Sequence, residues 1–310
     1  MSFFRIWKFF LLTIFCALHS FCQARFEDHL RTCENKVEGE QVKGIDFIYL
    51  INLDFRPDRL KNSLEGLAPY KIVPYRFPAV IGKELSAEAL NDLGLSFQEG
   101  MEEDYWVNHF PVEGKGHMER EFLCQRCYGK TVFSKYMRKG AIGCTLSHLS
   151  VLQDAYDSGY ETVWVLEDDI CVKREPHYIS TLIERLDALV GKDNWDVLYT
   201  DQDREFDSER DLDSVLWYIF RPDVGPSNQA FLRKRDVVSE DFVKLGSRWR
   251  THSMIIRRSG MRKILAFEKK HHMFIPYDHE IALVDDIRLY MTRYPVVTCG
   301  NSRSDIQNCE

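Results

Sequence analysis

Three adjacent carboxylates, Glu167, Asp168 and Asp169, are the residues of this chain best suited to chemistry. They directly follow residues 162–166, a short β-branched and apolar run. Clustered carboxylates repel one another and resist burial unless a cation or water offsets their charge. Their oxygens are the ligands that hard divalent cations prefer. We therefore expect a cation site that bridges an anionic substrate such as a diphosphate; the alternative is a solvated acidic turn.

A helix and a strand must position this acidic cluster. The helix is predicted by apolar residues that recur every three or four positions, namely Ile142, Leu146, Leu149, Leu152 and Tyr156. Gly140 and Gly143 allow a tight entry to the helix, and Gly159 is placed to end it with positive φ. Residues 162–166 show no polar alternation, which predicts a strand buried on both faces of a parallel sheet. Ligands of open α/β sheets bind at the carboxyl ends of such strands.

A second candidate site lies where residues 45–53, a nearly continuous apolar run, lead into Asn52, Arg56 and Arg59. Pro57, followed by leucines at helical spacing, predicts a helix that starts there. Arginines in such a strand-to-helix turn can meet the phosphates or the base of a nucleotide. The alternative is that both arginines pair with nearby acids.

The rest of the chain alternates between strands and helices. Strands are predicted over 75–80, 195–199, 215–220, 253–256 and around 295–297, and helices from Ser86, over 176–190, over 259–267 and through Leu289. This alternation predicts an α/β fold with a mostly parallel, doubly wound sheet flanked by helices, in a single domain. Residues 83–139 show no sustained period, so we expect a variable insertion with short helices.

Composition limits the possible functions. The chain has 310 residues, 45% of them hydrophobic and 29% charged, as in an ordinary globular protein. Its formal net charge is -7. An acidic body argues against general nucleic-acid binding, which requires a basic surface.

Residues 1–24 have the pattern of a targeting segment. Arg5 and Lys8 precede an apolar run over 9–18. Cys22 and Ala24 are small residues at positions three and one before a possible cleavage site, which follows Ala24. The run is shorter than the ~20 residues of a spanning helix. We expect a cleaved signal peptide, with an uncleaved N-terminal anchor as the alternative. Residues 25–44 are polar and are predicted to be a spacer, which leaves 45–310 as the functional domain.

Several motifs together resemble glycosyltransferase family 25. They are Ile51-Asn52-Leu53-Asp54 with Arg56 and Arg59, Gly143-Cys144-Thr145-Leu146-Ser147-His148 followed by Leu166-Glu167-Asp168-Asp169, Pro276-Tyr277-Asp278-His279, and Ser304-Asp305-Ile306. The resemblance covers roughly 45–306 and is weak over 83–139 and 204–250. The family includes lipopolysaccharide and lipooligosaccharide sugar transferases and the collagen hydroxylysine galactosyltransferases.

The resemblance implies a GT-A-like fold and an inverting transfer from a nucleotide sugar, typically UDP-galactose, with Mn²⁺ or Mg²⁺. It implies that Asp169 binds the metal and Asp168 the nucleotide, with Glu167 in support. It further implies donor-binding roles for Asn52, Arg56, Arg59, Ser147 and His148. The last of these could orient a carboxylate or a phosphate.

An inverting transfer is one displacement, so it needs one general base on the acceptor side. Asp278, His279 and Glu280 are the candidates, and Asp278 occupies the matching family position. His279 could instead ligate the metal, because GT-A enzymes often close their site with a C-terminal histidine. The alternative for this trio is a helix N-terminus that carries favourable acids in its first turn.

The cysteines beyond residue 24 are odd in number, so at least one is free. Cys124 and Cys127 form a lone C-x-x-C, which lacks the second pair of a zinc site and could be a short disulfide in an exported protein. Cys299 and Cys309 could form another. Cys144 is expected to be a small packing residue.

The expected partners are a nucleotide sugar and a glycan, glycolipid or protein acceptor, with membrane association possible through the N-terminal segment. The export signal places the enzyme in the endoplasmic reticulum or Golgi lumen of a eukaryote. In a bacterium, it places the enzyme at the membrane or in the periplasm. A rival function is a non-catalytic binding or adhesion protein on the same scaffold, because a fold does not fix function. A metal-dependent phosphoesterase ranks last, because it would need a second cluster of metal ligands.

Overall fold

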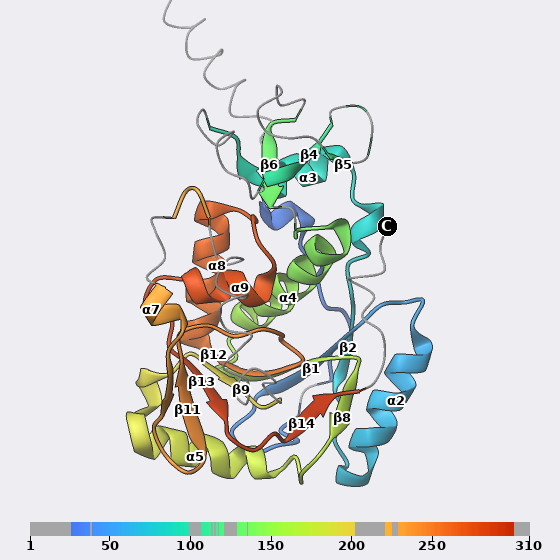
Figure 1. The fold of residues 1–310 in the computed structure, drawn as a ribbon. Coiled ribbons are helices and arrows are strands. Elements are labelled where there is room, and N and C mark those ends of the chain that lie inside the picture. The colour runs from blue at the N-terminus through green and yellow to red at the C-terminus, as the bar shows by residue number, and fades with distance from the viewer. Residues whose placement is uncertain are drawn as a thin grey trace, which may run out of the picture.

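An eight-stranded sheet forms the centre of the computed structural model (Figure 1). Its strands, in spatial order, are β10 (Arg235–Val237), β11 (Phe242–Leu245), β13 (Leu289–Thr292), β9 (Val197–Tyr199), β12 (Ser253–Arg257), β7 (Thr162–Glu167), β1 (Phe47–Asn52) and β2 (Tyr75–Pro78). The structure describes residues 26–37, 39–98, 107–112, 114, 116, 118–120, 129–134, 136–201, 221–224 and 229–300.

The sheet is mixed but mostly parallel in strand direction. Strand β1 pairs in parallel with β2 and β7, and β9 pairs in parallel with β13. Strand β12 runs antiparallel to both of its neighbours, β7 and β9, and β11 is antiparallel to β13 and β10. All strands except β11 and β12 therefore end at the same edge of the sheet, whereas β12 begins there.

Helices cover both faces of the sheet (Figure 1). On one face lie α4 (Lys139–Asp157) and α8 (Arg258–His271), and on the other lie α2 (Pro57–Leu67) and α5 (Tyr178–Val190). The apolar residues of β1 alternate between the two cores: Tyr49 packs with the α4 side and Leu50 with the α2 and α5 side. The burial of both strand faces explains the continuous apolar runs, because neither face meets water.

Shorter elements complete the chain. They are η1 (Phe26–His29), η2 (Ala68–Tyr70), η3 (Gly82–Glu84), α3 (Ala87–Leu93), β3 (Leu95–Ser96), β4 (Val107–Pro111), β5 (Met118–Arg120), β6 (Thr131–Ser134), β8 (Ile170–Val172), η5 (Lys192–Asn194), α7 (Gln229–Leu232), α9 (Tyr277–Glu280), η6 (Ile281–Leu283) and β14 (Val297–Cys299). Strands β3, β6, β4 and β5 form a small second sheet above the main body (Figure 1). Residues 83–139 thus contribute strands as well as the expected helix at Ser86, whose hydroxyl caps α3.

The fold class and most of the predicted elements are confirmed. The predicted helix through Leu289 is wrong, since helical structure ends at Leu283 and Leu289 begins β13. The glycine assignment for the start of α4 is also corrected: Gly143 lies inside the helix, where it allows a close backbone approach, whereas Gly159 does follow the helix with φ +79°. Residues 1–24, the strand at 215–220, Cys124 with Cys127, the 304–306 motif and Cys309 lie outside the described residues.

In the part of the chain that is described, no helix combines the length and apolar character that crossing a membrane requires.

Candidate active site

The acidic cluster lies in the turn between β7 and β8, at the edge where the parallel strands end. Strand β8 pairs with β14, and the Gly300 amide donates a 2.6 Å hydrogen bond to the Asp169 carbonyl. The turn is therefore held from both sides: by β7 inside the main sheet and by the β8–β14 pair. This placement matches the edge of the sheet predicted for the cluster.

Glu167 and Asp169 converge on His252, which immediately precedes β12. The His252 Nδ1 lies 2.8 Å from Asp169 Oδ1 and 3.3 Å from Glu167 Oε2. Burial lowers the pKa of His252, but pairing with the two carboxylates outweighs it and raises that pKa to about 11. Burial likewise opposes ionisation of Glu167, yet hydrogen bonds from His148 and His252 hold its pKa well below the usual range.

These three side chains could also hold a metal ion. One ligand atom from each lies within 4.8 Å of the others. Two carboxylates and one imidazole suit Mn²⁺, and a hard oxygen-rich set is compatible with Mg²⁺ as well. The residues present therefore fit the cation that the sequence led us to expect, with His252 as a ligand that the sequence did not reveal.

Asp168 is not part of this cluster of possible ligands and is 7% exposed. The Asn52 amide donates a 2.7 Å hydrogen bond to Asp168 Oδ2, and Arg59 Nη1 lies 3.2 Å from Oδ1. Burial raises the pKa of Asp168 to about 6, against the opposing effects of Asn52 and Arg59. The Ser63 hydroxyl donates to the Asp168 carbonyl at 2.8 Å. Asp168 therefore ties the acidic turn to β1 and α2.

The two arginines of the β1–α2 turn do pair with acids. Arg59 is buried against Asp168, whereas Arg56 forms a two-point contact with Asp58 at 3.0 and 3.1 Å. The Asn52 oxygen accepts a 3.0 Å hydrogen bond from Arg76 Nε. The donor-binding roles assigned to Asn52, Arg56 and Arg59 stay predictions, and the geometry places Asn52 and Arg59 in direct contact with the acidic turn.

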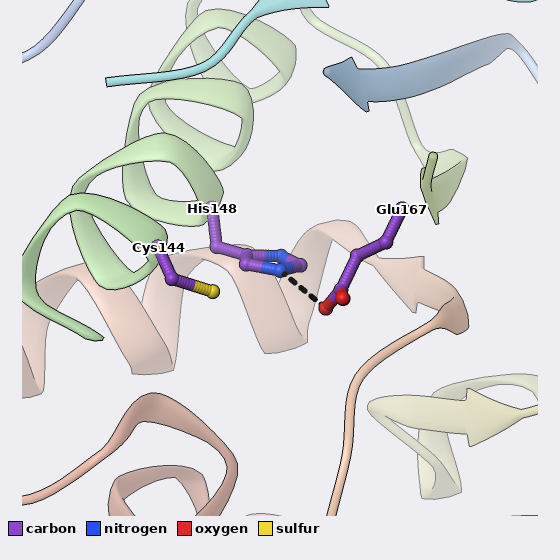
Figure 2. A group of neighbouring side chains, drawn as sticks. All are labelled: Cys144, His148 and Glu167. Carbon is purple, nitrogen blue, oxygen red and sulfur yellow. Dashed lines mark hydrogen bonds and ion pairs between the residues drawn. The ribbon is translucent and has the colours of Figure 1, made fainter. Parts of the chain in front are cut away.

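His148 projects from α4 toward the acidic turn (Figure 2). Its Nε2 lies 3.1 Å from Glu167 Oε1, and its ring stacks on Tyr277 with centroids 4.7 Å apart. The Thr251 hydroxyl donates to the same Glu167 oxygen at 2.7 Å. His148 therefore orients a carboxylate, as the sequence suggested, although it does so inside the protein.

Ser147 lies one residue earlier on α4 and has a different environment. It is 1% exposed, donates to the Gly143 carbonyl at 2.7 Å and accepts from the Val80 amide at 2.8 Å. These contacts join α4 to the loop after β2. The predicted donor-binding role of Ser147 therefore has no exposed group to act through.

Asp278, His279 and Glu280 of α9 lie in three different environments. Asp278 is 23% exposed in its side chain and accepts hydrogen bonds from the Arg250 amide at 2.9 Å and the His279 amide at 3.1 Å. Glu280 is fully buried, where Arg221 and the Phe274 amide bind its carboxylate. Only Asp278 has the exposure that a general base for a bound acceptor requires.

His279 is 7% exposed, and burial lowers its pKa despite the adjacent Asp278. Its ring meets Trp249 edge-on, with centroids 5.7 Å apart. It belongs to neither group of possible metal ligands found among the described residues. His252 lies where a histidine ligand was expected from His279.

Cys144 of α4 lies close to the acidic turn and to Asp278. Cys144 is half-buried, and burial together with the charges of Glu167, Asp278, Asp169 and Asp168 raises the pKa of its thiol well above the usual range. Four carboxylates from β7, its turn and α9 thus act on one point of α4. Cys144 therefore belongs to the same edge of the sheet as the acidic turn.

Residues 248–252 form the part of the site that the sequence did not reveal. Arg248 Nη1 lies 2.8 Å from Asp201 Oδ1 at the end of β9, the Arg250 amide binds Asp278, and the last two residues contact Glu167. Burial raises the pKa of Asp201, with Arg248 opposing it. The available signal was a run of mostly polar residues, Arg-Trp-Arg-Thr-His, directly before an apolar strand.

Comparisons with a family model and with known proteins identify the same family. The model of glycosyltransferase family 25 (LPS biosynthesis protein) matches residues 45–281. An Aedes aegypti protein named glycosyltransferase 25 family member is 26% identical over 242 residues, which cover 78% of this chain and 31% of that protein. A Drosophila melanogaster protein of the same name is 28% identical over 172 residues, which cover 56% of this chain and 23% of that protein.

A Mus musculus protein named inactive glycosyltransferase 25 family member 3 is 25% identical over 245 residues, which cover 78% of this chain and 32% of that protein. The chain thus spans about a third or less of the length of these curated relatives.

Proposed function

The chain belongs to glycosyltransferase family 25, and from this premise we propose that it is a metal-dependent, inverting hexosyltransferase. The proposed donor is a UDP-sugar, with galactose as the first hexose to test. The proposed acceptor is a hydroxyl group of a glycan, glycolipid or protein. We also propose that residues 1–24 direct export, so that the acceptor is met in a secretory compartment or at a membrane.

The observation that carries this proposal is the convergence of Glu167, Asp169 and His252 at the carboxyl edge of the sheet. A divalent cation bound there would stabilise the charge that develops on the departing diphosphate. The protein holds these ligands in place beforehand. His148 and Thr251 fix the Glu167 carboxylate, and the Gly300 amide fixes the Asp169 backbone.

Asp278 is the proposed general base. Hydrogen bonds from the Arg250 and His279 amides fix its carboxylate, and its partial exposure leaves access for an acceptor hydroxyl. It would take the hydroxyl proton as the oxygen attacks the sugar, in the single displacement that an inverting transfer requires. Asn52 and Arg59 position Asp168 on the proposed nucleotide side of the site.

A non-catalytic binding protein on the same scaffold is the second candidate. The observation that favours it is the relative in Mus musculus that is named inactive. The acidic site of the present chain argues for activity, since its carboxylates and their hydrogen-bonding partners are all in place.

The test is UDP release by the full chain from a panel of UDP-sugars, with Mn²⁺ or with a chelator. We expect metal-dependent release from one sugar, with a loss of at least ~100-fold in Asp169→Ala because a metal ligand is removed. Asp157→Ala is the matched control, because this carboxylate is exposed at the end of α4. A folded chain that neither releases UDP nor binds it in a Mn²⁺-dependent manner would overturn the proposal.

A further inference from the structure

Helix α4 presents a cysteine and a histidine on one face, one turn apart. Cys144 and His148 are four residues apart, a spacing that places side chains above one another on a helix. Figure 2 shows both pointing to the same side, where Glu167 reaches them from the end of β7. The thiol, one imidazole nitrogen and one carboxylate oxygen all lie within 4.8 Å of one another.

This donor set differs chemically from the neighbouring cluster. One sulfur, one nitrogen and one oxygen suit Zn²⁺, whose ligands lie ~2.0–2.3 Å from the ion. The Glu167–Asp169–His252 cluster has no sulfur and suits harder ions. Because α4 is mostly buried and His148 stacks on Tyr277, two of the three ligands are fixed in place before any ion arrives.

His148 directs one of its ring nitrogens toward Glu167. The residue is 1% exposed, and its Nδ1 has no hydrogen-bond partner in the described part of the chain. When Nδ1 carries the ring proton, the Nε2 lone pair faces Glu167 Oε1 at 3.1 Å. Two electron-pair donors that face each other in a buried site repel, and a cation bound between them would offset this repulsion.

The surrounding charge also favours a cation. Glu167, Asp168, Asp169 and Asp278 all act on the Cys144 thiol. A divalent ion would offset these charges, and its binding would displace the thiol proton to solvent and form the metal–sulfur bond.

We propose that Cys144, His148 and Glu167 form a second cation site, selective for Zn²⁺. Both sites use Glu167, so Zn²⁺ in the second site removes a ligand from the Glu167–Asp169–His252 cluster. Zinc therefore antagonises the manganese-dependent reaction. The proposal of a zinc site does not depend on the proposed function, whereas the proposed antagonism between zinc and manganese does.

Binding is tested with Co²⁺, which reports thiolate ligation through a charge-transfer band in the near ultraviolet. The full chain is used with Cys124→Ser and Cys127→Ser, so that this pair adds no thiolate signal. We expect a saturable band that Zn²⁺ abolishes and that Cys144→Ser removes. Cys171→Ser is the matched control, because this exposed thiol lies outside the group, and its band should be unchanged.

The absence of a saturable band in the folded parent chain, or a full band in Cys144→Ser, would overturn the proposal. If Cys144→Ser does not fold, alkylation of Cys144 in the parent chain replaces it, with Cys171 as the internal reference. Zinc should slow modification of Cys144 at least ~10-fold relative to Cys171, by occupying the thiol as a ligand. Equal modification rates with and without Zn²⁺ would overturn the site.

The antagonism is measured separately, as inhibition of Mn²⁺-dependent UDP release by Zn²⁺. We expect the Zn²⁺ concentration for half inhibition to rise at least ~10-fold in Cys144→Ser relative to Cys171→Ser, because a metal ligand is lost. A cobalt band without any UDP release supports the zinc site and counts against the proposed function alone. Inhibition that is equal in both variants would overturn the antagonism.

Discussion

Two carboxylates on α9 show how neighbouring residues of similar chemistry acquire different roles. Asp278 is partly exposed and fixed by two backbone amides, whereas Glu280 is buried against Arg221. The sequence makes both candidates for the general base, because it does not show which direction each side chain takes. Burial distinguishes them.

We expect Asp278→Asn to reduce sugar transfer by about 10²–10⁴-fold while UDP binding is retained, because only the proton acceptor is removed. Glu280→Gln should instead lower the free energy of unfolding by roughly 1.5–3 kcal/mol, since it weakens the buried, charge-assisted hydrogen bond from Arg221, which keeps Asp223 as its second partner. Steady-state kinetics and urea unfolding of the two variants check these expectations.

The two measurements serve as controls for each other. Wild-type unfolding of Asp278→Asn would show that its kinetic defect is not a folding defect. A Glu280→Gln chain with unchanged stability but strongly reduced transfer would reverse the two assignments.

Among the elements, strand β12 explains why part of the site escaped prediction. A parallel sheet places functional residues after each strand, and this rule correctly located the acids after β7 and Asn52 at the end of β1. Strand β12 runs the other way, so the residues before it, 248–252, reach the same edge. A buried strand of five residues with an apolar centre carries no information about its direction, because both faces are buried in either case.

Helix α4 packs closely against the loop after β2, and Gly143 lies at this contact. A Cβ atom there would lie 2.6 Å from the Val80 oxygen and 2.6 Å from the Gly82 nitrogen. We expect Gly143→Ala to destabilise the protein by about 1–3 kcal/mol, since the helix must move away from the loop after β2. Because Cys144 and His148 lie on the same helix, Mn²⁺-dependent activity should also fall.

Gly66→Ala is the matched control for this helix contact. Gly66 lies in α2, and its added Cβ would meet only Val172 Cγ2, at an ordinary 3.8 Å. Alanine should therefore stabilise this helix by roughly 0.5–1 kcal/mol. Thermal unfolding compares the two variants, and equal shifts in both would contradict the packing argument.

At the scale of the whole molecule, the buried carboxylate of Asp196 connects separate segments of the chain. It accepts hydrogen bonds from Ser259 and Lys263 of α8 and from Arg288 before β13. Burial opposes its ionisation, but these donors lower its pKa to about 2 from the usual 3.8. A depressed carboxyl pKa stabilises the fold above pH ~4, and this stabilisation is lost as the pH falls through about 2.

We therefore expect Asp196→Asn to lose about 2 kcal/mol or more of unfolding free energy at pH 7, with a smaller loss near pH 2. Urea unfolding across this pH range measures the difference from wild type. Asp157→Asn is the control, because its carboxylate is exposed and should show no comparable pH dependence. A loss of constant size from pH 7 to 2 would refute the electrostatic explanation.

The sequence predicted the overall architecture better than the contacts that complete the site. The layered α/β fold and the acids at its edge follow from apolar periodicity and from the position of Glu167–Asp169. The roles of His252 and Glu280 depend on strand direction and long-range packing, which local patterns do not encode. The same limit explains Leu289, whose apolar neighbours fit either a helix or a strand.

Strand β14 has a practical consequence for anyone who produces this protein. It contributes none of the metal ligands, yet it pairs with β8, and the Gly300 amide that follows it holds the Asp169 backbone. A stop codon, protease cut or affinity tag placed near residue 296 would therefore behave in an assay like an active-site lesion. Expression boundaries should therefore retain β14 and Gly300.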